Sequence, residues 1–410
     1  MVHHVSNQTQ IDQVIAPPSK SYAQRIFLAA VLSSEPTIIE AIGENEDINH
    51  LIQIGRDLGV ECHKEGNGSL EVIPSNFPAA AELNIGESGL GIRLLVNVLA
   101  CIGGDFRIEG KGSLASRSMI EFEGIMNQLQ VNFQSENGFI PLQIKGKAKG
   151  GEILFDGQKS SQYLSGLLMG LPLLNEDSVI EVSNLKSRPY VDITLDVLNQ
   201  FGIQIRHDNY QTFYIKGGQV YQSPKRIKVE GDYSGMANFV VLGAIQNGIS
   251  IQGLSPQSVQ GDKAILDALH LAGGKYEWKG ETLHILPTTL TYFEFDANDC
   301  PDLFPPLVIM AAAAKGTSII KGCKRLVHKE SNRATVIQSE AAKMALKVEL
   351  QEDEMFIFGK AKLKSTTIDS HNDHRIAMMG AIAATLTESG IEVNESEAVR
   401  KSFPKFWELF

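Results

Sequence analysis

The sequence has few cysteines, no long apolar run and no excess of positive charge. Its four cysteines lie far apart without a CxxC pair, at Cys62, Cys101, Cys300 and Cys323. This spacing argues against a disulfide framework and against a zinc site. The longest apolar stretch, around residues 307–314, is too short to span a bilayer. The formal charge of −11 argues against nucleic acid as the main partner, because such a partner requires a basic face.

Targeting, low-complexity and metal-binding signals are also missing. The N-terminal MVHHVSNQTQ lacks the charged and apolar regions of a signal peptide. With 43% hydrophobic and 21% charged residues and no biased tract, the chain is expected to be globular throughout. No HExxH or comparable spacing occurs, so we expect neither a metal nor a cofactor. We predict a soluble cytoplasmic monomer, with no membrane partner, whose 410 residues form two domains.

What the sequence does contain is a unit of strand, polar loop and apolar helix that recurs six times. The units begin 68, 70, 74, 66 and 74 residues apart, at Ile15, Leu83, Ile153, Ile227, Phe293 and Thr367. Each unit places polar and charged residues where its helix begins. Because the first N–H groups of a helix are unpaired and favour negative charge, several anion-binding helix starts are expected. An anionic substrate is therefore the first functional hypothesis.

Each of the first five units continues with a second helical pattern and a hairpin. The second helices are expected at 46–58, 118–129, 191–201, 264–272 and 334–345. The hairpins are expected to start at Glu61, Val131, Ile203, Lys275 and Leu346. Each repeat is thus predicted to be a β-α-β-α-β-β unit. The sixth unit is expected to end after a second helix at 399–409.

The ends of the chain suggest how the repeats divide. The extended stretch 3–16 is expected to complete the sixth repeat, which places both termini in one domain. Repeats one to three then form an inserted domain, 18–228, and repeats four to six form the second domain, 1–17 and 229–410. Two crossovers near 17–19 and 228–231 join the domains, an arrangement that suits hinge closure over a ligand.

The segment PPSKSYAQR places two cations, Lys20 and Arg25, at the first helix start. Cations there oppose the helix dipole, so they suggest a bound anion, whereas the alternative is two solvated cations. This segment resembles the N-terminal signature of 5-enolpyruvylshikimate-3-phosphate (EPSP) synthase. The sixfold repeat resembles that family's two-domain inside-out α/β barrel, in which each domain contains three β-α-β-α-β-β repeats. The resemblance covers essentially the whole chain.

The resemblance implies two substrates, shikimate 3-phosphate and phosphoenolpyruvate. The segment GESGLGIR from Gly86 corresponds to the family's phosphoenolpyruvate loop. The implied substrate-binding residues are Ser21, Arg25, Gly89, Arg117, Ser160, Ser161, Gln162, Ser187, Tyr190, Arg333, Arg375 and Lys401. The implied catalytic residues are Lys20, Asp302, Lys329, Glu330 and His374. Helix caps and local salt bridges are the alternatives for these residues, but their joint occurrence in family order favours a site.

The implied reaction adds the sugar-acid 5-hydroxyl to C2 of phosphoenolpyruvate while C3 is protonated, and then eliminates phosphate. Asp302 is expected to accept the hydroxyl proton, Glu330 and Lys329 to act at C3, and Lys20 to assist the departing phosphate. Glu87 stands where the family commonly has Asn. A carboxylate beside an anion site is unfavourable unless it pairs with a cation or points away.

Two alternatives remain open. UDP-N-acetylglucosamine enolpyruvyl transferase shares the repeat architecture, but its family uses a reactive cysteine that the corresponding loop, 111–117, lacks. A non-catalytic phospholigand-binding paralogue would keep the cations and lose proton transfer. The retention of Asp302, Lys329 and Glu330 argues against that alternative.

Overall fold

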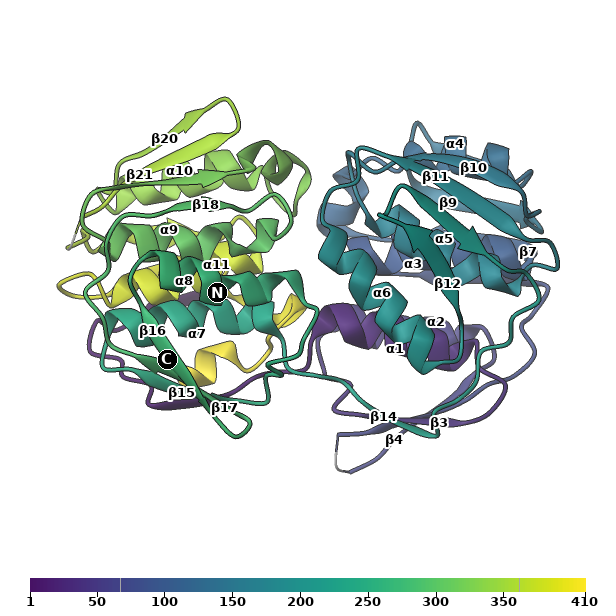
Figure 1. Ribbon diagram of the computed structural model, residues 1–410, viewed down its shortest axis with the longest axis horizontal. Helices are drawn as coiled ribbons and strands as arrows, with labels where there is room; N and C mark the ends of the chain where they lie inside the picture. Colours follow the sequence, from purple (N-terminus) through teal and green to yellow (C-terminus); the bar gives the residue numbers. More distant parts are fainter. Residues whose placement is uncertain (67, 361) are drawn as a thin grey trace. The chain divides into compact units, whose positions relative to one another are not determined.

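The computed structural model describes residues 1–66, 68–360 and 362–410. Their contacts separate the chain into two compact units. The inserted unit is Pro18–Val229, and the discontinuous unit combines Met1–Pro17 with Glu230–Phe410. Each unit has its own hydrophobic core. Figure 1 shows helices and sheets in both units.

The inserted unit contains three four-stranded sheets, with the orders β14-β3-β5-β4, β6-β7-β9-β8 and β10-β11-β13-β12. In each sheet the first two strands are parallel, and the last two form an antiparallel hairpin. The strands are β3 (Thr37–Glu40), β4 (Glu61–Lys64), β5 (Leu70–Ile73), β6 (Ala80–Asn84), β7 (Gly104–Glu109), β8 (Asn132–Glu136), β9 (Phe139–Gly146), β10 (Glu152–Asp156), β11 (Ser178–Ser183), β12 (Ile205–Asp208), β13 (Thr212–Ile215) and β14 (Arg226–Lys228).

Buried helices form the centre of the inserted unit. Helix α3 (Gly89–Ile102) packs against α1 (Lys20–Val31) and α5 (Gln162–Gly170). Nearly every residue of these helices is buried, which explains why they are apolar on all sides rather than on one face. The second helices of the repeats, α2 (Glu46–Asp57), α4 (Glu121–Gln128) and α6 (Arg188–Gln200), each retain an exposed face.

The discontinuous unit repeats this plan. Its sheets have the orders β16-β17-β15-β2, β18-β19-β21-β20 and β1-β23-β22. Helices α7 (Tyr233–Ile245), α9 (Phe304–Ala313) and α11 (His374–Ala384) pack against one another, and α8 (Ile265–Leu271) and α10 (Arg333–Lys343) are the second helices. The strands are β1 (Val2–Val5), β2 (Gln13–Ile15), β15 (Ile249–Gln252), β16 (Lys275–Lys279), β17 (Thr282–Leu286), β18 (Glu294–Asp296), β19 (Thr317–Lys321), β20 (Val348–Gln351), β21 (Glu354–Phe358), β22 (Thr367–Asp369) and β23 (Ile391–Asn394).

The repeat prediction is confirmed for the first five units. All five hairpins pair antiparallel, as β4–β5, β8–β9, β12–β13, β16–β17 and β20–β21. The predicted turn of the first hairpin includes Asn67, which lies outside the described residues. Helices α2, α4, α6, α8 and α10 begin and end within three residues of the predicted bounds.

The predicted helix at 399–409 is wrong. Two 3₁₀ segments, Ser396–Lys401 and Phe406–Leu409, occupy this region instead. Pro404 lies between them. Because proline lacks an N–H and its ring clashes with the preceding turn, a continuous helix is broken at this point.

The predicted role of residues 3–16 is correct for only one of their two strands. Strand β1 pairs with β23 and so completes the sixth sheet, but β2 pairs in parallel with β15 of the fourth repeat. The chain enters the inserted unit at Pro18, three residues after the end of β2. Strand β2 therefore belongs to the discontinuous unit, whereas the helix that follows it, α1, belongs to the inserted unit. Strand β14 shows the opposite arrangement. It pairs with β3 of the inserted unit, whereas the helix that follows it, α7, belongs to the discontinuous unit.

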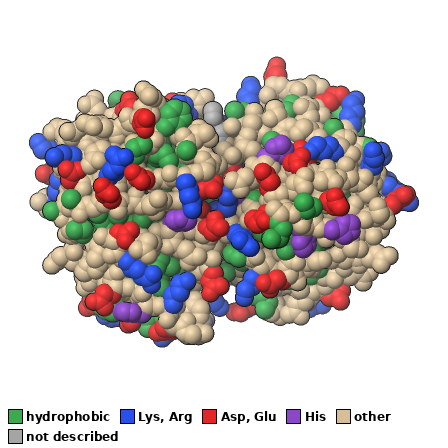
Figure 2. Space-filling view, turned by 180° about the vertical axis from the view of Figure 1, so that it is seen from behind, with side chains coloured by type: hydrophobic (Ala, Val, Ile, Leu, Met, Phe, Trp, Pro, Cys, Tyr) green, Lys and Arg blue, Asp and Glu red, His purple; other side chains and the backbone are tan. Residues whose placement is uncertain are grey.

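The exclusions drawn from composition can be compared with the structure. All four cysteines are buried free thiols. Among the described helices, none is both long enough and apolar enough to cross a membrane. On the face drawn in Figure 2, acidic and basic side chains are interspersed rather than gathered into one basic area.

Candidate functional site

The start of α1 in the inserted unit is linked to two neighbouring helices. The Lys20 ammonium lies 3.1 Å from the Asp47 carboxylate at the start of α2. Gln24 donates to Asp47 at 3.4 Å and accepts from the Ser88 hydroxyl at 3.3 Å. Ser88 caps α3 by accepting the Gly91 N–H at 3.1 Å. Lys20 is therefore an ion-paired, mostly buried cation rather than a solvated one.

Arg25 is completely buried, and within the described residues its guanidinium donates to neutral oxygens. Its guanidinium donates to Thr194 Oγ1 at 2.7 Å, to the Ser21 carbonyl at 2.8 Å, to the Tyr190 carbonyl at 3.1 Å and to Ser165 Oγ at 3.4 Å. Burial lowers the pKa of Arg25 to about 10, so it stays charged near neutral pH. Arg25 thus joins α1, α5 and α6 and places a positive charge among neutral hydrogen-bond partners.

Two predicted phosphate-binding residues lie in direct contact. A Cβ built on Gly89 would overlap the Arg117 guanidinium, so only glycine allows Arg117 this position at the start of α3. Arg93, which was not among the predicted site residues, extends the group. It donates to the Gly89 carbonyl at 2.9 Å and to Gln162 Oε1 at 3.0 Å. The Arg93 Nε has no hydrogen-bond partner within the described residues.

Two of the serines expected to bind substrate do not cap their helices through their side chains. Ser161 precedes α5 and Ser187 precedes α6, and both side chains are buried without a capping hydrogen bond. Ser187 has a left-handed backbone, φ +56°, which costs a non-glycine residue energy. Ser160 differs, because its hydroxyl accepts the Gln162 N–H at 3.2 Å. The capping alternative therefore does not explain Ser161 and Ser187.

In the discontinuous unit, Arg333 at the start of α10 lies among three carboxylates. It donates to Asp302 Oδ1 at 2.7 Å, to Glu330 Oε2 at 2.7 Å and to Asp373 at 2.9 and 3.2 Å. Its side chain is 1% exposed. Although burial lowers the pKa of Arg333, the three carboxylates raise it above its ordinary value. Arg333 is therefore a fixed cation that holds the acidic groups together.

Asp302 is the carboxylate at which the cations meet. The Lys329 ammonium lies 3.1 Å from it, and Arg375 Nη2 lies 3.9 Å from its second oxygen. Burial raises the pKa of Asp302, but Lys329, Arg333 and Arg375 together lower it well below its ordinary value. Burial also lowers the pKa of Lys329, against the opposing effect of Asp302. Asp302 is thus an ionised carboxylate, and burial makes the neighbouring Lys329 ammonium a stronger acid than an ordinary lysine.

The start of α11 contributes the remaining predicted residues. Asp373 caps this helix by accepting the Arg375 N–H at 2.9 Å, and His374 is buried as the first helical residue. Arg375 is 5% exposed, and within the described residues its Nε and Nη1 have no hydrogen-bond partner. A buried guanidinium with unused donors is expected to meet an acceptor absent from the chain itself, such as a bound anion. Lys401 donates to the Asn372 carbonyl at 2.9 Å.

Several residues of these groups were not predicted from the sequence. Asp262 is buried beside Asp302 and Arg375, and burial, followed by the charge of Asp302, raises its pKa to about 6. Thr194 and Ser165 hold Arg25, and Asp47 pairs with Lys20. For Ser165 in α5, the sequence did offer one signal, a polar residue within an otherwise apolar helix. Such a signal does not indicate which residue the polar side chain contacts.

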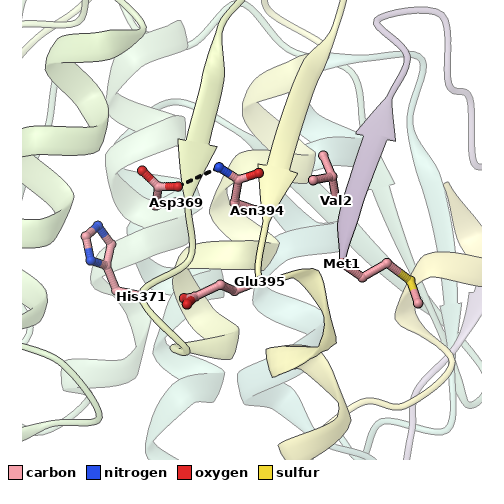
Figure 3. Close-up of a pocket in the computed structure, with 6 residues that line it drawn as sticks. All are labelled: Met1, Val2, Asp369, His371, Asn394 and Glu395. Atoms are coloured by element: carbon pink, nitrogen blue, oxygen red, sulfur yellow. Dashed lines mark hydrogen bonds between the residues drawn. The ribbon is translucent and has the colours of Figure 1, made fainter.

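One group of side chains has the composition of a metal site. Within the described residues, Glu340, Asp369 and His371 bring ligand atoms within 4.8 Å of one another. Figure 3 shows Asp369 and His371 in a pocket at the ends of β22 and β23, with Asn394 bonded to Asp369. The Lys343 ammonium already lies 2.8 Å from Glu340 and 2.7 Å from Asp369. Lys343 thus supplies the positive charge that these carboxylates require.

Comparison with known proteins places these groups in context. The model of the family EPSP synthase (3-phosphoshikimate 1-carboxyvinyltransferase) matches residues 6–410. The 3-phosphoshikimate 1-carboxyvinyltransferase of Clostridium kluyveri is 37% identical over 98% of this chain and 95% of its own length. That of Sulfurovum sp. is 33% identical over 97% and 95%. The structure of EPSP synthase from Acinetobacter baumannii aligns with a TM-score of 0.83 at 25% identity, covering 100% of this chain and 97% of that one.

These matches confirm two predictions from the sequence motifs. The structural match extends over the whole chain and confirms the α/β class and the two-domain inside-out α/β barrel. The family match confirms the enzyme class inferred from PPSKSYAQR and the residues that follow it in order. The chain belongs to the EPSP synthase (3-phosphoshikimate 1-carboxyvinyltransferase) family.

Proposed function

We propose that this enzyme transfers the enolpyruvyl group of phosphoenolpyruvate to the 5-hydroxyl of shikimate 3-phosphate and releases phosphate, a step of aromatic amino acid biosynthesis. One observation carries the proposal. The Asp302 carboxylate is held among Lys329, Arg333 and Arg375, and Glu330 shares the same arginine. This is an acid–base group surrounded by cations, in a chain whose family match extends over residues 6–410.

In the proposed addition step, Asp302 accepts the proton of the 5-hydroxyl as its oxygen bonds to C2 of phosphoenolpyruvate. A carboxylate whose pKa is this low is a weak base in the free enzyme. Substrate anions that draw Lys329 and Arg375 away from Asp302 would raise its basicity. The base is thus expected to become active only when the substrates are bound.

Protonation at C3 accompanies that bond, and Glu330 and Lys329 are the proposed proton donors. Burial lowers the pKa of Lys329, which makes its ammonium a better acid. In the elimination step, the C2–O bond to phosphate breaks and C3 loses a proton, so the enol double bond forms again. Lys20 is proposed to neutralise the departing phosphate, since it is a point charge at a helix start.

The remaining residues are proposed to bind the substrates. The hydroxyl and amide groups of the inserted unit, with Arg25, are assigned to shikimate 3-phosphate, and this set is Ser21, Ser160, Ser161, Gln162, Ser187 and Tyr190. Gly89, Arg117, Arg333, Arg375 and Lys401 are assigned to phosphoenolpyruvate, and His374 is assigned to catalysis beside Arg375. Because Arg333 already donates to three carboxylates, its binding role requires that one of these bonds be exchanged for a substrate oxygen.

A coupled phosphate-release assay tests the proposal. Purified enzyme with phosphoenolpyruvate is given shikimate 3-phosphate, UDP-N-acetylglucosamine or no acceptor. Phosphate release that requires shikimate 3-phosphate supports the proposal. Release with UDP-N-acetylglucosamine would favour the related transferase, and binding without release in any arm would favour a phospholigand-binding protein.

The proposal also includes a cytoplasmic monomer. Size-exclusion chromatography with light scattering tests the oligomeric state, and a mass of about 45 kDa is expected from the sequence mass of 44.8 kDa. A mass of twice that value would contradict a monomer.

A further inference from the structure

Glu87 connects two loops of the inserted unit. It lies between β6 and α3, two residues before Gly89. Its carboxylate accepts the Ser113 N–H at 3.0 Å and the Ser113 hydroxyl at 2.9 Å, both at Oε2. Ser113 belongs to the 3₁₀ helix η1 (Gly112–Ser116), which leads directly into Arg117. The carboxylate that was unfavourable in the sequence therefore has specific partners in the structure.

The backbones of the same two loops are also bonded to each other. Ile85 N–H donates to the Glu109 carbonyl at 3.0 Å, and Lys111 N–H donates to the Gly86 carbonyl at 2.9 Å. These bonds end at Lys111, the residue before η1. Beyond this point, the Glu87 carboxylate supplies the next connection between the loops, through Ser113.

Two close contacts lie at the two ends of η1. Gly112 has φ +56°, and a Cβ built on it would overlap the Glu87 carboxylate. At the other end, a Cβ on Gly89 would overlap the Arg117 guanidinium. Glu87 thus packs on the first residue of η1, and Arg117, the residue after η1, packs on the start of α3. A displacement of η1 would move Arg117 away from Gly89.

We propose that Glu87 is a positioning residue that holds η1 and thereby places the Arg117 guanidinium at the start of α3. The identity of the bound anion as phosphoenolpyruvate rests on the proposed function. Glu87 is expected to set the affinity for that anion through Arg117, without contacting it. A negative charge near a bound anion weakens its binding, so the positional effect must exceed this electrostatic cost.

An effect of the Glu87 charge and an effect of Glu87 on the position of Arg117 predict opposite changes in the KM for phosphoenolpyruvate, so substitutions can distinguish them. Both Ser113 bonds end on one oxygen, so the amide oxygen of Glu87→Gln can accept both while the charge is removed. Glu87→Ala removes the charge and both bonds. Ser113→Ala removes only the hydroxyl bond. Glu82→Ala, which removes an exposed carboxyl on β6, is the matched control.

We expect Glu87→Ala to raise the KM for phosphoenolpyruvate about tenfold, the effect of weakening one charge-assisted contact. The KM for shikimate 3-phosphate and the melting temperature should stay near the parent values. Glu87→Gln should have a KM for phosphoenolpyruvate at or below that of the parent, Ser113→Ala an intermediate value, and Glu82→Ala the parent value.

Three results would overturn the inference. A lower KM for phosphoenolpyruvate in both Glu87 variants would mean that the carboxylate acts through its charge alone. Equal increases in both substrate KM values with a lower melting temperature would indicate a general structural role, and unchanged constants would indicate none.

If the parent enzyme releases no phosphate with shikimate 3-phosphate, the proposed function fails separately. Titration calorimetry with inorganic phosphate then decides the Glu87 inference, which requires weaker binding by Glu87→Ala than by Glu87→Gln.

Discussion

The two units hold their buried arginines in different ways. In the inserted unit, Arg25 and Arg93 donate to neutral oxygens of serine, threonine, glutamine and the backbone. In the discontinuous unit, Arg333 donates to three carboxylates, and Asp302 meets three cations. Among the described residues, the first arrangement gives the arginines no carboxylate partner, whereas the second pairs the cations with carboxylates.

This difference indicates a division of work. Neutral partners hold a cation in place without competing for its charge, which suits the binding of a phosphate or carboxylate. Carboxylates packed against cations have shifted pKa values, which suits proton transfer. We therefore expect changes at Arg25 and its neutral partners to affect mainly binding, and changes at Asp302 itself to affect mainly turnover.

The largest expected effect is on turnover in the discontinuous unit. Asp302→Asn should lower kcat by about 10²- to 10⁴-fold, because it removes the proposed general base while keeping the size of the side chain. Steady-state phosphate release measures this change. Glu294→Gln, which removes an exposed carboxyl on β18, is the control and should keep the parent kcat. A kcat within about twofold of the parent would remove Asp302 from the role of base.

The two buried arginines should differ in their effect on stability. Arg333→Met removes the buried cation that three carboxylates share, so the free energy of unfolding should fall by about 3–5 kcal/mol. Arg25→Met removes hydrogen bonds to neutral oxygens only and should cost about 1–3 kcal/mol. Urea unfolding of both variants gives the comparison. An equal or larger cost for Arg25→Met would contradict the difference between the units.

The buried Asp262 should make stability depend on pH. Its pKa is about 6 in the folded chain, against an ordinary value of 3.8, so the folded state retains a proton that the unfolded state has lost between these values. The parent therefore loses stability as pH rises from about 4 to 6, by an amount on the order of 2 kcal/mol. Asp262→Asn lacks this loss, and its stability relative to the parent should rise over that range and then level off. Urea unfolding at several pH values measures the gap, and a constant gap would contradict the assignment.

The smallest effect is expected at Gly89. In Gly89→Ala the new methyl group must displace the Arg117 guanidinium, which is the end of a flexible side chain, so stability should change little. The KM for phosphoenolpyruvate should rise about tenfold, since one charge-assisted bond of about 1.5 kcal/mol is weakened. Kinetics with each substrate varied in turn measures this effect. A larger increase in the KM for shikimate 3-phosphate would contradict the assignment of Arg117.

Much of the fold could be predicted from the sequence because the same local pattern recurs. The hairpins and second helices depend on local turn residues and periodicity, and five of each were found. The break in the final helix could also have been predicted from the local sequence, because Pro404 lies within the predicted helix. The partner of β2 could not be predicted, because pairing with β15 depends on where the chain passes from one unit to the other.

The candidate site shows the same limit. Asp302, Glu330 and Arg333 were recognised through family motifs, and the structure brings them together. The long-range partners of Lys20 and Arg25 were not recognised, because nothing in the local sequence links Asp47 to Lys20 or Thr194 to Arg25. Glu87 was noticed only as a departure from the family, and its partner Ser113 lies 26 residues away.

The central claim is that binding and proton transfer reside in different sets of residues. Its most direct test is calorimetric titration of shikimate 3-phosphate into Asp302→Asn and Ser161→Ala, beside their kcat values. The account predicts a nearly unchanged Kd with a large loss of kcat for Asp302→Asn, and a Kd about tenfold weaker with a small loss of kcat for Ser161→Ala. Equal losses of binding and turnover in both variants would contradict it.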